Sequence, residues 1–375
     1  MSRRMSLLGA SLLLLLRSGA SVVASELVCH GISDIVNDQW CNENCNGHPP
    51  NCPEELCECE SPSPPPTPTP GPPLERHAYI GYWGSAAQLP TLEQLPEALR
   101  RGYNVISVAF GDLIQSDGSF QIHTNMGPPP TKESIGSAAG FGASQWEYLL
   151  SFGGQNAAGP AVPDIEEFVS GFVSGVRDAR LKYGFDGIDI DIETGMTTPL
   201  LKALRKVFAQ LHSEGFVISM APQPLNIDPD EVGVILDGSY NCYVPLVDKE
   251  TIGYVSYVAP QLYNNPMPLN SLEEYIRSMQ RDAAFDWEGE KLVVNIPSSK
   301  LVFGYPAAPG AAPSGPSQPW EADPAELAAH YQASETLMAT GGAMTWSIGW
   351  DATNGWDWIT NVKKIWDDKS NMVLP

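Results

Sequence analysis

Residues 184–193, GFDGIDIDIE, place acidic side chains at alternate positions among isoleucines. Side chains of a β-strand alternate between its two faces, so Asp189, Asp191 and Glu193 would share one face while the isoleucines share the other. Neighbouring acids on that face would lie about 7 Å apart along the strand. Like charges in an enclosed place raise at least one pKa, and a carboxyl group that stays protonated near neutral pH can act as a general acid. The pattern therefore predicts a file of catalytic carboxylates.

Two structural interpretations compete with this one. A calcium-binding loop is polar throughout and carries glycine at its sixth position, whereas isoleucine fills every second place here. A solvated edge strand would leave the isoleucines as the whole core contribution and would give no reason for Gly187. We favour the catalytic interpretation, and we expect neither a metal nor a cofactor.

The elements that would position these acids alternate between strand-like and helix-like patterns. The sequence predicts eight strands, at residues 77–83, 103–110, 147–154, 185–193, 216–222, 254–263, 300–307 and 342–350. Residues 292–297 are an alternative for the seventh strand. Helical patterns fall between the strands, at residues 92–102, 164–184, 197–215, 271–284 and 323–342.

Eight β/α units over residues 76–375 predict an α/β fold, a (β/α)₈ TIM barrel. The active site of such a barrel lies at the carboxyl ends of its strands. Glu193 would then lie at the mouth, with Asp191 and Asp189 deeper, and the isoleucines would pack on the outer helices.

The chain begins with the features of a secretory signal. Arg3 and Arg4 precede an apolar run, and small residues fit cleavage after Ala24, which defines a signal peptide over residues 1–24. The run is too short to span a bilayer, so we expect a secreted, extracellular protein rather than one with an uncleaved anchor. Residues 61–73, SPSPPPTPTPGPP, predict a stiff polyproline spacer.

Between signal and spacer, residues 25–60 form a cysteine-rich module. An even, dense set of cysteines after a signal peptide predicts three disulfides, with connectivity open among fifteen pairings. A zinc site with His30 and His48 is an alternative, but paired C-x-x-C spacings are absent. The module either binds a carbohydrate or is a purely structural knob; Trp40 is its only aromatic residue. The six residues are Cys29, Cys41, Cys45, Cys52, Cys57 and Cys59, and Cys242 is left as a buried free thiol.

The charge balance is strongly acidic. The chain has 44 Asp and Glu against 21 Lys and Arg, a net charge of −23. Such a balance argues against nucleic acid or an anionic membrane as partner and suits an uncharged or cationic polymer. We expect a monomer.

Several motifs together resemble one enzyme family. DGIDIDIE matches the D-x-x-D-x-D-x-E signature of family 18 glycoside hydrolases, the chitinases and their relatives, with Asp186 filling its first place. SFGG at 151–154, QLYNN at 261–265 and the sequence MTWSIGWD resemble its third, sixth and eighth strands. The resemblance covers roughly residues 77–368 and is closest to the short plant and fungal class III type.

The resemblance implies a residue-by-residue assignment. Glu193 would be the general acid/base, and Asp191 would bind the substrate's acetamido N–H and share a proton network with Asp189. Tyr263 would donate to the acetamido carbonyl oxygen, and Trp346 would stack under the sugar. The substrate's own N-acetyl oxygen would then act as nucleophile.

Further substrate-binding candidates follow from their neighbourhood. Gln261 and Asn264 flank Tyr263 with polar reach at a barrel mouth. Four aromatic or apolar residues are further candidates, and core packing is an equal alternative for each of them: Tyr82, Phe110, Met220 and Trp350. Asp186 is the last substrate-binding candidate.

Three functions stay open on these grounds. The first is a secreted retaining chitinase acting on β-1,4-linked N-acetylglucosamine polymers. The second is an endo-β-N-acetylglucosaminidase acting on N-glycans, and the third is a chitin-binding lectin, although family lectins usually lose the acid that Glu193 supplies. Exo-acting members of the family that the chain resembles carry an extra α+β insertion between strands seven and eight, which walls the groove into a deep cleft. Residues 308–322 are too short for such a subdomain, so the resemblance implies an open groove and endo-acting cleavage, with Trp320 as a distal sugar contact.

Overall fold

The computed structural model describes residues 28–32, 36–45, 52–53, 55–60, 77–85, 89–113, 115–236, 241–265 and 269–367. The chain divides into two compact units, residues 1–67 and 68–375. The expected signal peptide and polyproline spacer lie outside the described residues. Within the described ranges, no helix combines the length and the apolar character needed to cross a membrane.

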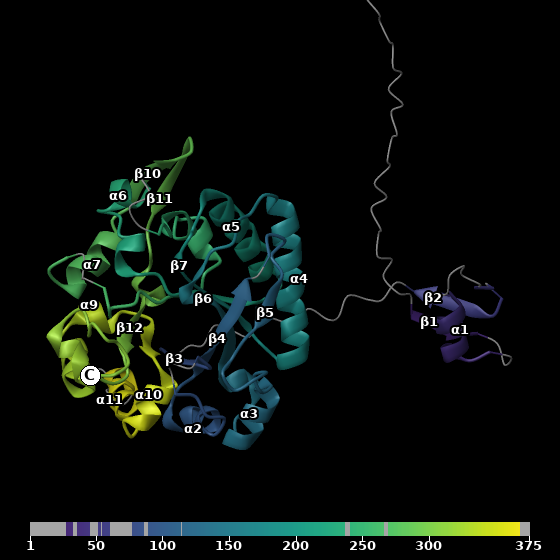
Figure 1. The fold of residues 1–375 in the computed structure, drawn as a ribbon, viewed down its shortest axis with the longest axis horizontal. Helices are drawn as coiled ribbons and strands as arrows, with labels where there is room; N and C mark the ends of the chain where they lie inside the picture. The colour runs from purple at the N-terminus through teal and green to yellow at the C-terminus, as the bar shows by residue number, and fades with distance from the viewer. Residues whose placement is uncertain are drawn as a thin grey trace, which may run out of the picture. The chain divides into compact units, whose positions relative to one another are not determined.

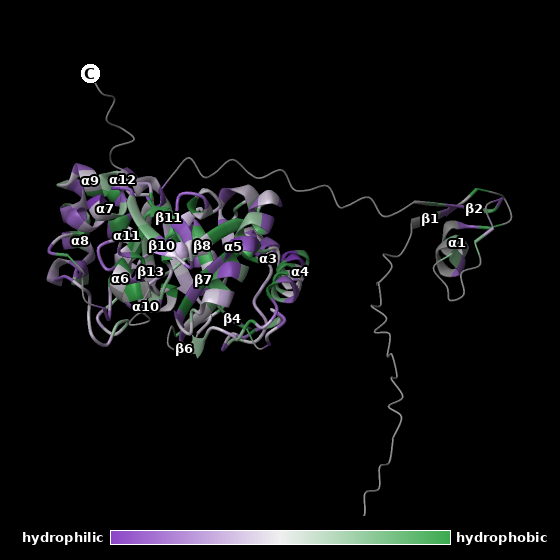
Figure 2. Cartoon of the chain, turned by 90° about the horizontal axis from the view of Figure 1, so that it is seen from above, coloured by the Kyte–Doolittle hydropathy of each residue, from purple (hydrophilic) through white to green (hydrophobic). Residues whose placement is uncertain are grey.

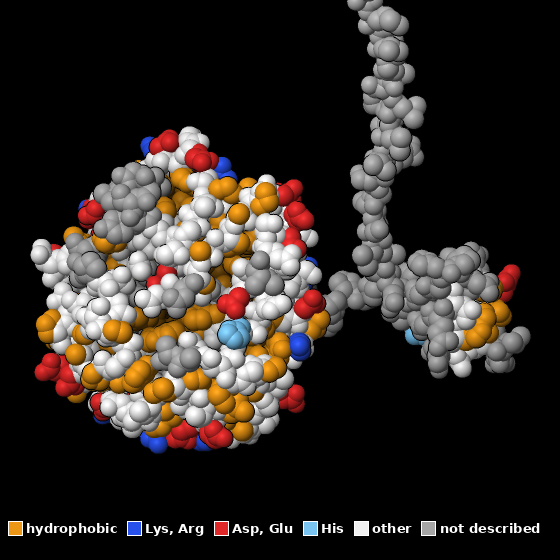
Figure 3. Space-filling model, in the orientation of Figure 1, with side chains coloured by type: hydrophobic (Ala, Val, Ile, Leu, Met, Phe, Trp, Pro, Cys, Tyr) orange, Lys and Arg blue, Asp and Glu red, His pale blue; other side chains and the backbone are white. Residues whose placement is uncertain are grey.

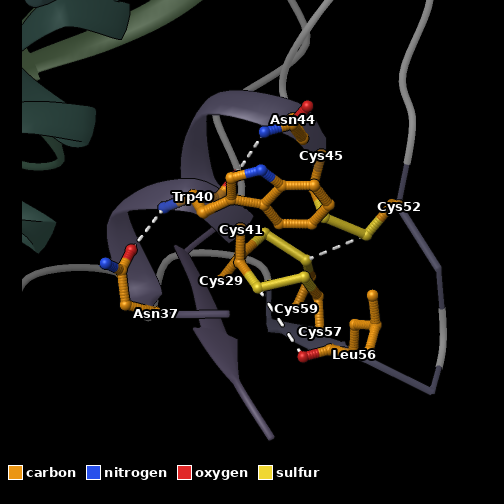
Figure 4. Close-up of a disulfide and its surroundings, with 10 residues drawn as sticks. All are labelled: Cys29, Asn37, Trp40, Cys41, Asn44, Cys45, Cys52, Leu56, Cys57 and Cys59. Carbon is orange, nitrogen blue, oxygen red and sulfur yellow. Dashed lines mark hydrogen bonds between the residues drawn. A yellow bond between two sulfur atoms is a disulfide. The ribbon is translucent and has the colours of Figure 1, made fainter. Parts of the chain in front are cut away.

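The first unit is a small disulfide-linked structure. Strands β1 (Val28–Gly31) and β2 (Cys57–Glu60) pair antiparallel, and helix α1 (Asp38–Cys45) lies between them in sequence. Its three disulfides, as predicted, join Cys29 to Cys59, Cys41 to Cys57 and Cys45 to Cys52. Trp40 packs against this sulfur cluster (Figure 4) and is half-buried. Cys242, in the second unit, is a buried free thiol, also as predicted.

The second unit is a nearly closed parallel barrel surrounded by helices (Figure 1). The strand order is β12-β13-β3-β4-β6-β7-β8-β9, and isolated bridges from Val258 to Leu301 and from Gln261 to Gly304 link β9 to β12. All eight predicted barrel strands are present. They are β3 (Ala78–Trp83), β4 (Val105–Leu113), β6 (Glu147–Ala158), β7 (Gly187–Thr194), β8 (Val217–Met220), β9 (Tyr257–Val258), β12 (Val302–Pro306) and β13 (Gly342–Trp346).

Burial of the isoleucine face of β7 fixes the direction of its acids. Ile188, Ile190 and Ile192 are buried in the cluster that also holds apolar residues of helices α4 (Ile165–Tyr183) and α5 (Thr198–Ser213). Burying one such side chain contributes about 1.5–3 kcal/mol, so the opposite orientation, with isoleucines inward and acids against the helices, is strongly disfavoured. The surrounding helices carry both hydrophobic and hydrophilic residues (Figure 2), as expected for amphipathic helices that pack on a barrel with one face.

Local signals set the helix ends. The Asp164 side chain accepts from two backbone N–H groups at the start of α4, and Gly184 ends that helix in the left-handed conformation. The remaining helices are α2 (Gln94–Arg101), α3 (Lys132–Ala139), α6 (Val232–Leu236), α7 (Leu272–Met279), α8 (Pro324–Gln332), α9 (Glu335–Met338), α10 (Ile348–Thr353), α11 (Asp357–Val362) and α12 (Lys364–Asp367). A short strand β5 (Phe120–Ile122) pairs antiparallel with the end of β4.

Several predicted elements differ from the structure, among them the helix predicted at 271–284, which ends at Met279. Residues 292–297, the alternative seventh strand, instead contribute to β11 (Glu290–Val294), which forms a hairpin with β10 (Ala283–Trp287) outside the barrel. The predicted helix at 323–342 is two helices, because Ser334 accepts from the Leu337 N–H and starts α9. The predicted strand at 254–263 contains only the two residues of β9, and that at 342–350 ends at Trp346, before α10.

Candidate active site

The acid file of β7 points into the barrel, where Asp189 is its deepest member. Asp189 is buried, and its Oδ2 accepts hydrogen bonds from the hydroxyls of Tyr82 at 2.7 Å and Ser151 at 2.6 Å. Burial raises the pKa of Asp189, while the hydrogen bonds from Ser151 and Tyr82 lower it. The other oxygen, Oδ1, is buried with no hydrogen-bond partner among the described residues. Asp189 therefore keeps one free acceptor atom inside the barrel.

Asp191 is the middle member of the file, and its pKa is raised the most of the three. Its Oδ1 accepts from the Gln261 Nε2 amide at 2.8 Å, and the same amide donates to the Ala221 carbonyl at 2.9 Å. Burial raises the pKa of Asp191 well above its ordinary value, and the negative charges of Glu193 and Asp189 raise it further. The Asp191 carboxyl therefore holds its proton to higher pH than an ordinary aspartate does.

Glu193 is the outermost member and lines the cavity at the barrel mouth. Burial raises the pKa of its carboxyl, whereas hydrogen bonds from Gln261 and Gln223 lower it. The Gln223 Nε2 atom lies 3.5 Å from Glu193 Oε2. A carboxyl with a raised pKa and access to a cavity has the properties of a general acid.

The cavity has a volume of about 360 Å³ and opens at the carboxyl ends of the strands. The face drawn in Figure 3 is hollowed near its centre, and hydrophobic and acidic atoms meet there. Among the described residues that line the cavity, Asp191 and Glu193 supply the only carboxylates. The lining consists of Phe110, Gly154, Gln155, Asp191, Glu193, Gln223, Gln261, Tyr263, Asn264, Asn265, Gly310, Ala311, Pro313, Trp346 and Trp350.

Aromatic side chains supply the apolar part of the cavity. The Trp346 ring lies 6.2 Å from the Phe110 ring and 5.7 Å from the Tyr82 ring, measured between centroids. Tyr263 is buried, and burial together with the charges of Asp191 and Glu193 raises its pKa well above the ordinary value. Its hydroxyl therefore stays protonated and can donate a hydrogen bond into the cavity.

Most of the residues proposed from sequence come together here. Gln261, Asn264, Phe110 and Trp350 line the cavity, whereas Tyr82 lies below it and supports Asp189 instead.

Three sequence-based assignments need correction. Asp186 precedes β7 at its amino end, where its Oδ2 accepts from Lys132 Nζ at 2.6 Å and the Tyr148 N–H at 2.7 Å. Met220 pairs with Ile190 and is buried in the cluster between strands and helices. Trp320 stacks on His330, with ring centroids 3.9 Å apart, and is not among the residues that line the cavity.

Gln223, Gln155 and Asn265 are cavity residues that the sequence reasoning missed. Gln223 lies beyond the end of β8, and Asn265 is the last residue of the QLYNN motif, to which no role was assigned. Polar residues just after a predicted barrel strand were the available signal, because the carboxyl ends of all strands meet at one mouth.

Comparisons with known proteins agree with this geometry. The sequence profile of the glycosyl hydrolases family 18 matches residues 77–373. Endochitinase 4 of Metarhizium robertsii is 29% identical over 297 residues, covering 70% of this chain and 78% of that protein. A chitinase of Enterococcus faecalis is 27% identical over 310 residues, covering 72% of this chain and 81% of that protein.

A comparison of folds also finds a member of this family. The crystal structure of a family GH18 chitinase from Chromobacterium violaceum superposes with a TM-score of 0.63 at 22% identity, covering 83% of this chain and 87% of that one. Because the family profile spans most of the chain and includes the whole acid file, this protein is a glycoside hydrolase and belongs to glycosyl hydrolases family 18.

Proposed function

We propose that the protein hydrolyses polymers of β-1,4-linked N-acetylglucosamine with retention, using the substrate's own N-acetyl group as nucleophile. The observation that supports this most directly is the one-sided placement of the carboxylates. A two-carboxylate retaining site needs a nucleophile on the far side of the sugar, about 5–5.5 Å from the acid. Here both carboxylates among the described lining residues belong to the same strand, β7.

The first step would break the glycosidic bond. Glu193 gives its proton to the leaving oxygen while the acetamido carbonyl oxygen forms a bond to C1, which yields a cyclic oxazolinium. Tyr263, whose hydroxyl stays protonated, donates to the acetamido oxygen and orients it. Asp191 accepts the acetamido N–H and passes its proton to Asp189, which returns it to Asp191 in the second step.

The second step would regenerate the enzyme. The Glu193 carboxylate takes a proton from water, the water oxygen attacks C1, and the C1–oxygen bond of the oxazolinium breaks. C1 is inverted twice, so the β configuration is retained. Trp346 provides an apolar face under the sugar that undergoes reaction.

The names of the relatives favour chitin over N-glycans as substrate. The proteins from Metarhizium robertsii and Enterococcus faecalis are both named as chitinases. Product analysis on colloidal chitin beside a denatured glycoprotein tests this choice. Release of N-acetylglucosamine oligomers supports the proposal, whereas release of N-glycans alone would assign the enzyme to glycoproteins, and tight binding without products would make it a lectin.

We also propose endo-acting cleavage, which a short connection supports. Between β12 and β13 the chain contains one 3-10 helix (Pro319–Ala322), α8 and α9, and no strand that could build a walling subdomain. A soluble, partially acetylated chitosan should lose viscosity early and give mixed oligomer lengths. Dimers released from the first minute with little change in viscosity would contradict endo action.

We also propose that the protein is secreted and monomeric and that residues 25–60 bind carbohydrate. The three disulfides of that module suit an oxidising compartment. Cutting within residues 61–73 should leave activity on soluble oligomers unchanged and lower it on insoluble chitin. Equal activity of cut and intact protein on both substrates would remove the binding role.

A further inference from the structure

The carboxyl end of β7 is supported by sheet pairing on one side only. On the β6 side, pairing continues to Ile192 opposite Gly154 and to Thr194 opposite Ala158. On the β8 side, pairing ends at Ile190. The peptide that joins Ile192 to Glu193 therefore has no strand neighbour on that side, although a buried backbone carbonyl requires a hydrogen-bond partner.

Two side chains from the connection after β8 supply this missing partner. The Ile192 carbonyl accepts from the Tyr243 hydroxyl at 2.9 Å and from Asn241 Nδ2 at 2.5 Å. The Tyr243 hydroxyl also lies 3.4 Å from the Ile190 carbonyl. Asn241 Oδ1 accepts from the Met196 N–H at 2.7 Å, so a single amide group holds the backbone on both sides of Glu193.

The Tyr243 side chain is held in place by its surroundings, and its hydroxyl remains a hydrogen-bond donor. Its side chain is fully buried, and its own N–H donates to the Asn226 carbonyl at 2.9 Å. Burial and the nearby charges of Asp191 and Asp189 raise its pKa well above the ordinary value, so the hydroxyl keeps its proton.

We infer that Tyr243 and Asn241 are positioning residues that hold Glu193 at the distance and angle needed for proton transfer. This inference rests on the proposed function, in which Glu193 serves first as acid and then as base. Neither residue lines the cavity, so each acts through the β7 backbone rather than on the substrate. Catalytic geometry is sensitive to displacements of this kind, because a misplacement of about 1 Å can cost about 10²-fold in rate.

The chain offers a matched control. Tyr275 is also fully buried, and its hydroxyl donates to a backbone carbonyl, that of Pro224, at 2.6 Å. Tyr243→Phe and Tyr275→Phe thus each remove one buried hydroxyl–carbonyl hydrogen bond, but only the first removes it from β7. The two variants should lose similar amounts of thermal stability.

Kinetics on a soluble N-acetylglucosamine oligomer separate the two roles. Tyr243→Phe should lower kcat about tenfold with KM nearly unchanged, and Asn241→Ala should do the same, as expected for a displaced acid. Tyr275→Phe should keep the wild-type kcat. If kcat were equal in Tyr243→Phe and Tyr275→Phe, the positioning role would be refuted.

Hydrogen–deuterium exchange gives a readout independent of activity. Peptides covering residues 191–196 should exchange faster in Tyr243→Phe than in wild type. In Tyr275→Phe their exchange rate should equal that of wild type. Unchanged exchange in Tyr243→Phe would overturn the inference. A wild-type protein that hydrolysed none of the substrates would refute the proposed function, whereas this measurement would still decide whether Tyr243 holds the strand.

Discussion

The two ends of β7 carry carboxylates with opposite surroundings. At the amino end, Asp186 forms an ion pair with the buried Lys132 and also accepts the Tyr148 N–H. At the carboxyl end, within the described ranges, neither Asp191 nor Glu193 has an ion pair with lysine or arginine, and the side chains that donate to them are the neutral amides of Gln261 and Gln223.

This difference separates a structural acid from the acids that we propose to be catalytic. Burial raises the pKa of Asp186, but the charge of Lys132 opposes it. At Asp191, burial and the two neighbouring carboxylates all act in the same direction. A carboxylate neutralised by a cation keeps its charge and its position, whereas a buried file held by neutral donors can gain and lose protons. The partner, more than the motif, decides the role.

The largest expected effect is at the mouth. Glu193→Gln keeps the shape of the side chain but cannot donate a proton, and general acid catalysis contributes about 10²–10⁴-fold. Turnover of chitotetraose should fall by at least that factor, with an unchanged melting temperature. Wild-type turnover by the variant would exclude Glu193 as the acid.

Asp191→Asn should also lower the rate without weakening the fold. The amide cannot exchange a proton with Asp189 and would misplace the acetamido group, so kcat should fall about 10²-fold. Thermal stability should be equal to or above that of wild type, because a buried ionisable group is replaced by a neutral one. A large loss of melting temperature would show that Asp191 is structural, like Asp186.

Asp186→Asn should have the reverse profile. The substitution leaves Lys132 buried without its counter-charge, which should lower the free energy of unfolding by about 1–3 kcal/mol. This loss is smaller than for a fully buried pair, because the Asp186 side chain is 31% exposed. The kcat of the folded variant should stay near the wild-type value. Chemical denaturation and steady-state kinetics on one preparation measure both quantities, and a strong loss of kcat without destabilisation would restore Asp186 to the site.

Local sequence patterns predicted the barrel strands and the acid file because alternation is a property of a few adjacent residues. The same alternation separated Asp186 from the file, since it is three positions before Asp189 and so belongs with the isoleucines. The family signature, not the spacing, made it a substrate-binding candidate. Its true partner Lys132 lies 54 residues away and could not be inferred locally.

Other features depend on register or on turn chemistry. Met220 faces away from the cavity because it pairs with Ile190, and this pairing is not visible in either strand alone. The β10–β11 hairpin had a readable signal: Glu288 and Gly289 both have positive φ and form a two-residue turn between Trp287 and Glu290. Such a turn ending in glycine favours a hairpin, so the apolar run in β11 need not be a barrel strand.

The smallest expected effect concerns the pH dependence set by Gln223. Its amide hydrogen bond stabilises the charged form of Glu193 and so lowers a pKa that burial raises. Gln223→Leu removes that donor, so the Glu193 pKa should rise. Because the protonated acid is required for bond cleavage, the alkaline limb of kcat/KM should move to higher pH. The shift should be less than about one pH unit, since the Nε2–Oε2 distance is 3.5 Å.

Gln155→Leu is a matched control, because Gln155 lines the same cavity but is not among the groups that shift the Glu193 pKa. A limb that moves to lower pH, or that moves equally in both variants, would show that neutral donors do not tune this end of β7.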